Sequence, residues 1–387
     1  MNKETVNIVW LKRDLRSQDH APLLKAEREG IPYHIIYLFE PSSINYPDTS
    51  TRHLQFVYHS LLVLNKTFAP FNRRVEVFYA EAEAVFENLY KQFDIRSIFS
   101  YQESGTHHSW NRDKLVKSFC KTYQIDWQES QRDGILRGIK NRKNWNKQWH
   151  KKMHTPILKN TYTISNTPFI NHNFILPTKF KDKIKAYNKE YQPAGEINAW
   201  RYLKSFSDKR GFNYQKHISK PNESRISCSR LSPYLAWGNM SIKQAFQFIG
   251  THPNGIKNSR AFSAMLTRLH WHCHFIQKFE VECNYETACI NNGYELLAHD
   301  KNKDFIKAWK EGSTGFPLVD ACMRAVRKTG WINFRMRALL VSFFTFNLDQ
   351  DWRDGTYYLA QQFLDYEPGI HFPQFQMQAG TTGINTI

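Results

Sequence analysis

The sequence lacks several patterns that would place it quickly in a class of protein. Its six cysteines include no C-x-x-C pair, so neither a disulfide scaffold nor a zinc site of ordinary spacing is expected. No G-x-G-x-x-G follows the first predicted strand, which disfavours a conventional dinucleotide site. No apolar run reaches membrane length and no signal peptide is recognisable. We therefore expect a soluble, cytoplasmic protein.

Acidic residues are absent from one long stretch, residues 134–181. Within it, residues 137–154 place seven Lys and Arg side chains beside Trp145 and Trp149. Such a segment suits phosphate contacts together with base stacking. The alternatives are a solvated charged face and two tryptophans that only anchor the segment.

Net charge and aromatic content narrow the class of partner. The 387 residues carry a formal charge of +18, and 15% of them are aromatic. A basic excess of this size points to a polyanion such as nucleic acid, although membrane surfaces attract basic proteins too. Aromatic side chains fill cores, and this density also suits stacking on bases or on a ring cofactor.

Residues 1–130 alternate short apolar runs with helical patterns, which predicts a parallel sheet with helices on both faces, an α/β Rossmann-like domain. Strands are predicted at residues 5–10, 33–39, 75–79 and 97–101. Helices are predicted at residues 21–29, 51–68, 81–92 and 109–123. Residues 131–195 are interpreted as a basic connector, irregular over 160–180, and residues 196–387 as an all-α domain.

The last eighty residues contain the clearest helix signals. Pro317 suits the first turn of a helix, and Gly330 follows its predicted last turn. The next predicted helix, residues 332–348, is apolar nearly all round and should be buried. Arg335 and Arg337 near its start then need an anionic partner, for which the nearby carboxylates are Asp365 and Glu367.

Several motifs in this order and spacing resemble the photolyase/cryptochrome family. They are W-K-E-G-S-T-G-F-P-L-V-D-A-C-M-R (309–324), T-G-W (329–331), R-x-R (335–337), D-W-R-x-G (351–355), L-D (364–365), A-G-T (379–381) and S-R-L-S-P-Y-L-A-W-G (229–238). A looser match covers residues 10–23. The resemblance implies an α/β antenna domain (1–130), an interdomain connector (131–195) and a helical FAD-binding domain (196–387).

The resemblance also implies where FAD binds. Ser229, Ser232 and Arg230 could hold a pyrophosphate near a helix start, the alternative being an ordinary helix cap. Cys228 stands where relatives often have Thr. Arg337 and Asp365 would pair beside the reactive edge of the flavin, unless the pair only joins two helices. The implied FAD contacts are Tyr214, Cys228, Ser229, Arg230, Leu231, Ser232, Trp331, Arg337, Asp365, Tyr366, Glu367 and His371.

The implied activity is that of a blue-light-driven DNA photolyase, a carbon–carbon lyase. Reduced FAD would donate an electron to a flipped-out pyrimidine dimer in UV-damaged DNA. The implied catalytic residues are Trp271, Arg337, Asp365 and His371. The implied contacts to the lesion are Arg268, Trp271, Phe334, Arg335 and Met377. We expect a monomer without a metal site, since His270, His272 and His274 alternate along a helix and should not share a face.

Departures from the family pattern indicate an atypical branch. Arg268 replaces a Glu that contacts the dimer, Phe334 replaces an Asn, and His371 stands where an Asn faces the flavin N5. Phe375 replaces the tryptophan nearest the flavin, and Met377 a tryptophan that touches the lesion. The usual electron-transfer chain is thus interrupted. The remaining candidates for electron transfer are Trp352, which matches the middle tryptophan, Trp309 and Trp331.

Two other functions stay open. A cryptochrome-like photoreceptor without repair activity is favoured by the departures at Arg268, Phe334, His371 and Phe375. A basic nucleic-acid-binding protein without a working flavin is the third reading. The sequence leaves open the lesion type, the strand preference and whether an antenna chromophore, folate or deazaflavin, is bound.

Overall fold

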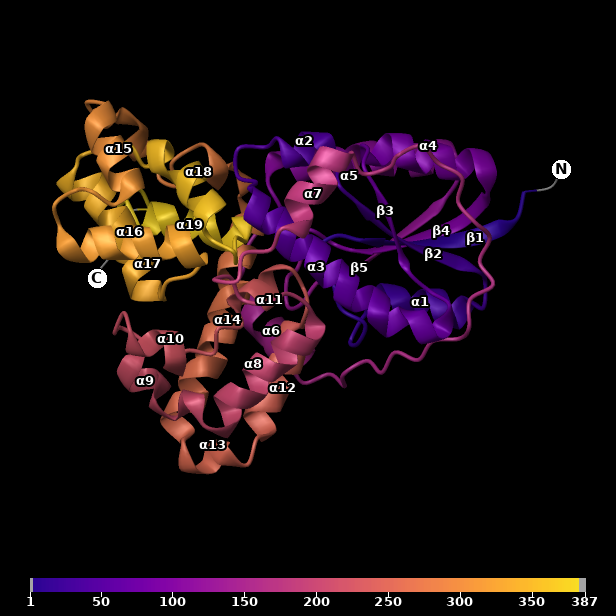
Figure 1. Ribbon diagram of the computed structural model, residues 1–387, viewed down its shortest axis with the longest axis horizontal. Helices are drawn as coiled ribbons and strands as arrows, with labels where there is room; N and C mark the ends of the chain where they lie inside the picture. Colours follow the sequence, from indigo (N-terminus) through magenta and orange to yellow (C-terminus); the bar gives the residue numbers. More distant parts are fainter. Residues whose placement is uncertain (1–2, 383–387) are drawn as a thin grey trace.

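A computed structural model describes residues 3–382, and its N-terminal part is a five-stranded parallel sheet (Figure 1). The strands are β1 (Thr5–Leu11), β2 (Tyr33–Leu38), β3 (Val75–Phe78), β4 (Asp94–Tyr101) and β5 (Asp126–Ser130), in the order β3-β2-β1-β4-β5. The four predicted strands are confirmed. The fifth was missed because its sequence, DWQES, is too polar for a buried strand and lies at the sheet edge.

Helices cover both faces of the sheet, as predicted. Helices α1 (Ala21–Glu29) and α3 (Thr51–Phe68) lie on one face, and α4 (Ala82–Gln92) and α5 (His107–Thr122) on the other (Figure 1). Side chains of β1 alternate between these layers. Val9 and Leu11 join the core with α1 and α3, whereas Ile8 and Trp10 pack with α4 and α5.

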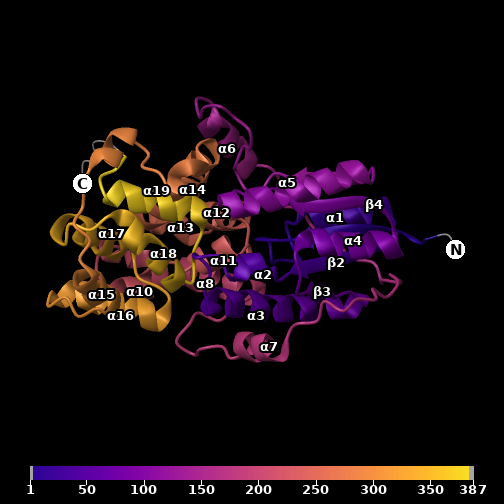
Figure 2. The ribbon, with the colours of Figure 1, turned by 90° about the horizontal axis from the view of Figure 1, so that it is seen from above.

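The connector runs over the surface and contains two helices, α6 (Trp145–Met153) and α7 (Thr178–Lys185), which lie on opposite sides of the molecule in Figure 2. Residues 155–177 between them form neither helix nor strand. Trp145 and Trp149 are buried, at 4% and 1% exposure. These two rings therefore anchor the connector, which was one of the alternatives, and they are too buried to stack on bases.

The helical domain begins at Gly195, whose φ of +98° and close contact with Val63 leave no room for a β-carbon. Its core continues into the first domain, because Tyr234, Trp237 and Leu364 belong to the same cluster as Phe56 of α3. Its helices are α8 (Glu196–Asp208), α9 (Tyr214–His217), α10 (Glu223–Ser227), α11 (Ser232–Ala236), α12 (Ile242–Thr251), α13 (Asn254–Lys257), α14 (Ser259–Val281), α15 (Lys303–Glu311), α16 (Pro317–Thr329), α17 (Phe334–Ser342), α18 (Trp352–Gln362) and α19 (Pro368–Gln378).

The motif at residues 309–324 shapes the backbone around α16. Asp320 accepts hydrogen bonds from the backbone of Thr314 at 2.8 Å and of Gly315 at 3.0 Å, which fixes the loop before the helix. Helix α16 begins at Pro317 and ends before Gly330, as predicted. The Gly330 carbonyl then accepts a 2.9 Å hydrogen bond from the amide of Leu364. This contact positions the segment that carries Asp365.

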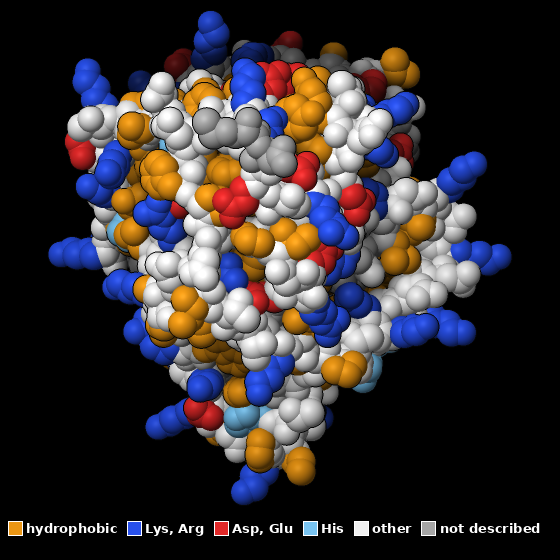
Figure 3. Space-filling view, turned by 90° about the vertical axis from the view of Figure 1, so that its right-hand side faces the viewer, with side chains coloured by type: hydrophobic (Ala, Val, Ile, Leu, Met, Phe, Trp, Pro, Cys, Tyr) orange, Lys and Arg blue, Asp and Glu red, His pale blue; other side chains and the backbone are white. Residues whose placement is uncertain are grey.

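Helix α17 continues into a π-helical turn at Phe343–Asn347, so the predicted helix over 332–348 is present. It is less buried than predicted, because Arg335 is exposed and its first turns line a cavity. Among the described residues no helix is long and apolar enough to cross a membrane. On the face of the α/β domain in Figure 3, Lys and Arg are interspersed with Asp and Glu.

Candidate functional site

Two adjoining cavities lie inside the helical domain. The larger, about 200 Å³, is enclosed by α14, the segment before α11 and the start of α17. The smaller, about 40 Å³, lies between α17 and α19. The two share a wall formed by Phe334, Arg337, Asp365, Ile370 and Gln374.

The shared wall carries an ion pair between Arg337 and Asp365. Nη2 of Arg337 lies 2.6 Å from Oδ2 of Asp365, whose side chain is 2% exposed. The other carboxylate oxygen, Oδ1, is buried and has no hydrogen-bond partner among the described residues. Asn333 caps α17 through the amide of Met336 at 2.9 Å, which fixes the turn that presents Arg337. The wall therefore offers a cation and a free acceptor side by side.

The opposite wall is strongly electropositive. The segment 228–232 lines the cavity, and Arg210 donates to the carbonyls of Cys228 at 2.7 Å and Ser229 at 3.2 Å. Arg230 has a left-handed backbone, with φ of +59°, and its guanidinium lies 4.0 Å from the ring centroid of Trp331. Burial, and then Arg225, lowers the pKa of Arg230 to about 10.

No carboxylate among the described residues lies at ion-pair distance from the four arginines of this region, Arg210, Arg225, Arg230 and Arg268. Buried guanidinium groups need an anion or full hydrogen bonding. Backbone carbonyls accept some of the hydrogen bonds of these guanidinium groups, and an anionic ligand would provide the missing negative charge. The Cys228 thiol adds no charge, because burial raises its pKa to about 11.

Helix α14 forms the wall at the cavity mouth. Arg268, Trp271, His272 and Phe275 recur at helical spacing and all line the cavity. Trp271 is 41% exposed, and the Arg268 guanidinium lies 4.8 Å from its ring centroid. Nε2 of His272 is buried without a partner among the described residues, and burial lowers the pKa of this imidazole.

The histidines of α14 divide between two faces. His272 faces the cavity, while His270 and His274 both contact Trp145 of α6, at ring-centroid distances of 5.0 and 5.8 Å. The prediction that none of the three shares a face is thus wrong for the outer pair, which is separated by four residues. The described residues hold no cluster of groups suited to a metal ion.

Helix α19 closes the smaller cavity. Nε2 of His371 donates to the carbonyl of Thr356 at 2.9 Å, and burial lowers the pKa of His371 to about 4. The ring is therefore neutral near pH 7 and keeps Nδ1 as an acceptor. Tyr366 also lines this cavity and donates its hydroxyl to Asp48 at 2.7 Å.

Three predicted site residues need comment. Glu367 lines the smaller cavity, but its carboxylate pairs with Arg132 at 2.8 Å and lies 3.8 Å from Arg13, so it is not the partner of Arg337. Arg335 is exposed on α17. On the described part of α19 the residues that line the cavities are Ile370, His371, Gln374, Phe375 and Gln378, and Met377 is not among them.

The predicted electron-transfer residues do not form one stack. Trp352 and Phe375 are buried neighbours, with ring centroids 6.4 Å apart, and Phe375 lies 5.7 Å from His371. Trp309 is fully buried against Phe344 at 4.3 Å. Trp331 belongs to the other wall, under Arg230. Phe375 therefore separates the oxidisable ring of Trp352 from the cavity.

Several cavity residues were not predicted as site residues, among them His272, Phe275 and Gln374. Each of these lies one helical turn from a predicted residue: His272 from Arg268, Phe275 from Trp271 and Gln374 from His371. Helical periodicity applied to the predicted residues would have found them.

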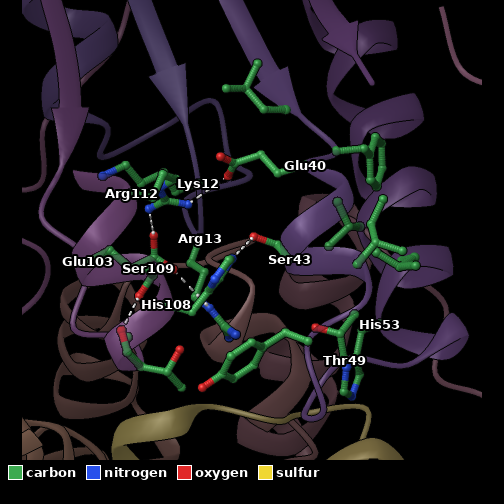
Figure 4. Close-up of a pocket in the computed structure, with 18 of the residues that line it drawn as sticks. Lys12, Arg13, Glu40, Ser43, Thr49, His53, Glu103, His108, Ser109 and Arg112 are labelled. Carbon is green, nitrogen blue, oxygen red and sulfur yellow. Dashed lines mark hydrogen bonds and ion pairs between the residues drawn. The ribbon is translucent and has the colours of Figure 1, made fainter. Parts of the chain in front are cut away.

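A further cavity, about 140 Å³, lies between the carboxyl edge of the sheet and the helical domain (Figure 4). It sits where the strand order reverses between β1 and β4, the usual ligand position in such sheets. Arg112 pairs with Glu40 at 3.1 Å and with Glu103 at 2.6 Å. Burial opposes ionisation of Glu103, but Arg112, Lys12 and Arg13 hold its pKa at about 2. The charges that line this cavity are thus largely neutralised by one another.

Comparisons with known proteins match both halves of the chain. Residues 7–167 match the family model described as DNA photolyase, and residues 265–387 match the one described as FAD binding domain of DNA photolyase. The chain is similar to the deoxyribodipyrimidine photo-lyases of Alkalihalophilus pseudofirmus, at 25% identity over 98% of this chain and 81% of that protein, and of Escherichia coli, at 23% identity over 97% and 82%.

Solved structures share the fold over the whole chain. A Synechocystis cryptochrome superposes with a TM-score of 0.88 at 19% identity, covering 100% of this chain and 84% of that one. A class III photolyase from Agrobacterium tumefaciens superposes with a TM-score of 0.85 at 20% identity, covering 100% and 82%. The predicted fold, an α/β domain followed by a helical domain, is confirmed.

Proposed function

This chain belongs to the photolyase/cryptochrome family, and we propose that it is a light-driven photolyase that repairs pyrimidine dimers in UV-damaged DNA. The observation that carries the proposal is one cavity with two different ends. An ion pair between the partly buried Arg337 and the buried Asp365 lies inside it, and a half-exposed Trp271 lies at its mouth. A cofactor can thus be held within while a base is received from outside.

The residues of the cavity fit FAD. The arginines around 228–232 lack a carboxylate partner among the described residues and would balance a diphosphate. Oδ1 of Asp365 is a free acceptor for an N–H of the ring system, and Arg337 next to it favours negative charge at the same edge. When bound, FAD would supply light absorption and electron transfer. His371 keeps its side of the cavity uncharged near neutral pH.

Trp271 would receive the lesion. Extruding a damaged base costs a few kcal/mol, and stacking on an aromatic side chain returns roughly 1–3 kcal/mol per base. The free energy of stacking nearly offsets the cost of extrusion where damage has already weakened base pairing. It does not offset the larger cost for an undamaged base, which therefore stays in the duplex. Arg268, 4.8 Å from the Trp271 ring, adds a cation where relatives place a carboxylate. The lesion would therefore be held by cationic contacts on this side.

The test is a repair assay with purified protein. Its visible spectrum should be that of a flavoprotein. Reduced protein should then restore, under blue light, an oligonucleotide with either a cyclobutane dimer or a 6-4 product, and fail in the dark. If neither lesion is repaired by flavin-loaded protein, the photolyase proposal is wrong. Light-dependent binding of a partner without repair would instead match a cryptochrome-type photoreceptor.

A further inference from the structure

The connector helix α6 is fixed against α14 beside the cavity mouth. Trp145 and Trp149 are buried, and their ring centroids lie 5.0 and 4.7 Å from that of His270. Nε2 of His270 donates to Oδ1 of Asn146 at 2.7 Å. Basic side chains of the acid-free segment are thereby held at fixed positions along α14.

Three basic groups meet where α6 begins. Nη1 of Arg142 lies 3.3 Å from Nε2 and 3.4 Å from Nδ1 of His274. Lys278 follows His274 by four residues on α14, so both present the same helix face. Arg142, His274 and Lys278 are all partly exposed, and Nζ of Lys278 lies 5.9 Å from the ring centroid of Tyr285.

Arg142 and Lys278 carry like charges here, and Arg142 contacts the imidazole of His274, which is neutral near pH 7. No carboxylate among the described residues lies at ion-pair distance from Arg142 or Lys278, although Glu282 follows one turn later on the chain. Burial, and then Arg142, lowers the pKa of Lys278. Burial and Arg142 also lower the pKa of His274 to about 4. Neighbouring cations without an anion are unfavourable unless a ligand supplies the negative charge.

We propose that Arg142, His274 and Lys278 form a phosphate-binding site for the DNA strand that carries the lesion. The proposal extends the proposed function, because it places the DNA backbone relative to Trp271. Along α14, His274 lies about 4.5 Å and Lys278 about 10.5 Å beyond Trp271, at 1.5 Å per residue. One strand of B-DNA advances about 3.4 Å per nucleotide. The phosphate held here then belongs to a nucleotide about one to three positions from the base on Trp271.

The site has the chemistry that a phosphodiester requires. The guanidinium of Arg142 can donate two parallel hydrogen bonds to one phosphate, and the Lys278 ammonium adds a point charge. The surrounding segment, residues 134–181, contains no Asp or Glu that would repel a polyanion. The contact between α6 and α14 would therefore bind the DNA backbone next to the cavity that receives the lesion.

Dark binding of undamaged single-stranded oligonucleotide to Arg142→Gln and Lys278→Gln tests the site. Each lost phosphate contact should reduce the slope of log K against log salt by about 0.7–1, which corresponds to about five- to tenfold weaker binding at 0.1 M salt. Lys278→Arg should restore the affinity. The control is Lys185→Gln on α7, on the opposite side of the molecule in Figure 2, where one exposed charge is lost and affinity should hold.

Neutralising single phosphates as methylphosphonates locates the contact on dimer-containing DNA. Wild-type protein should lose affinity when a phosphate one to three nucleotides from the dimer is neutralised, and Arg142→Gln should lose none further there. An unchanged salt slope in both variants, or an equal change in Lys185→Gln, would overturn the site. Because undamaged DNA and darkness suffice for the first measurement, failure of the site is distinguishable from failure of the repair proposal.

Discussion

Asp365 uses one carboxylate oxygen to hold Nη2 of Arg337 at 2.6 Å and leaves the other buried and unpaired in the cavity. An unpaired carboxylate oxygen inside a protein is costly, and a ligand that donates a hydrogen bond there recovers the cost. The pair therefore suits a ligand that has a hydrogen-bond donor for Asp365 and, beside it, a group that carries negative charge for Arg337. That chemistry fits one edge of a flavin ring.

Replacing Asp365 tests this pair. Asp365→Ala leaves Arg337 partly buried without its anion, which should cost about 3 kcal/mol of stability and release the flavin. Flavin absorbance of the purified variant and urea unfolding measure the two effects. Asp349→Asn removes an exposed carboxylate and should change stability by less than about 0.5 kcal/mol. Full flavin occupancy in Asp365→Ala would contradict the role of the pair.

Replacing Trp271 tests the cavity mouth. Trp271→Ala should weaken binding of dimer-containing DNA by roughly 1–3 kcal/mol, because one stacking surface is lost. Binding of undamaged DNA should change little, since no base is extruded there. Trp271→Phe keeps an aromatic face and should retain most of the difference in affinity between dimer-containing and undamaged DNA. Equal weakening for both DNAs, read by fluorescence anisotropy, would remove Trp271 from the lesion site.

Phe375 gives a prediction about light-driven reduction. A phenyl ring is far harder to oxidise than an indole, and Phe375 lies between Trp352 and the smaller cavity. Phe375→Trp should therefore speed photoreduction of bound flavin by an external donor, at a stability cost of about 1–3 kcal/mol for overpacking a buried site. Trp352→Phe in the wild-type background should change the rate little. A large loss of rate in that variant would show that electrons already cross Phe375.

The buried His53 predicts acid sensitivity. Burial lowers its pKa to about 3, and its Nε2 donates to the carbonyl of Phe363 at 2.8 Å. The unfolded imidazole titrates near 6.5, so the unfolded state binds more protons below that pH. The neutral, buried His53 therefore contributes fully to the free energy of unfolding only above about pH 6.5. That free energy declines as the pH falls toward 3, by about 2 kcal/mol between pH 7.5 and 5.

Urea unfolding at these two pH values measures the effect. His53→Gln should show a smaller loss of stability on acidification than wild type. His154→Gln, at an exposed position, should follow wild type. An unchanged pH dependence in His53→Gln would assign the acid sensitivity to other groups.

Periodicity and turn signals predicted the elements whose stability is local. The bounds of α1 and α3 and the ends of α16 follow from apolar spacing, Pro317 and Gly330. Strand β5 was missed because its place depends on pairing with β4, which no feature of DWQES encodes. Edge strands of this kind are specified by their neighbours.

In the candidate site, too, some features could be predicted from the sequence and others depended on the fold. The charge of Arg337 beside an apolar helix indicated only that it needs an anionic partner, and the resemblance to the family singled out Asp365. Glu367 stood two residues away with the same charge, and only the fold sends it to Arg132. Gln374 and His272 carry no charge that demands a partner, so only their helical spacing from His371 and Arg268 could have indicated their place in the cavity wall.

The hydrophobic core that runs from α1 and α3 into the helical domain has a kinetic consequence. Within residues 3–382 this core is continuous across the two halves, so they should melt together in a single calorimetric transition. A nucleotide cofactor could not then enter through a temporary separation of the two halves. It would have to thread through the opening beside Trp271 or be enclosed while the polypeptide folds, and exchange of cofactor from the mature protein should be slow.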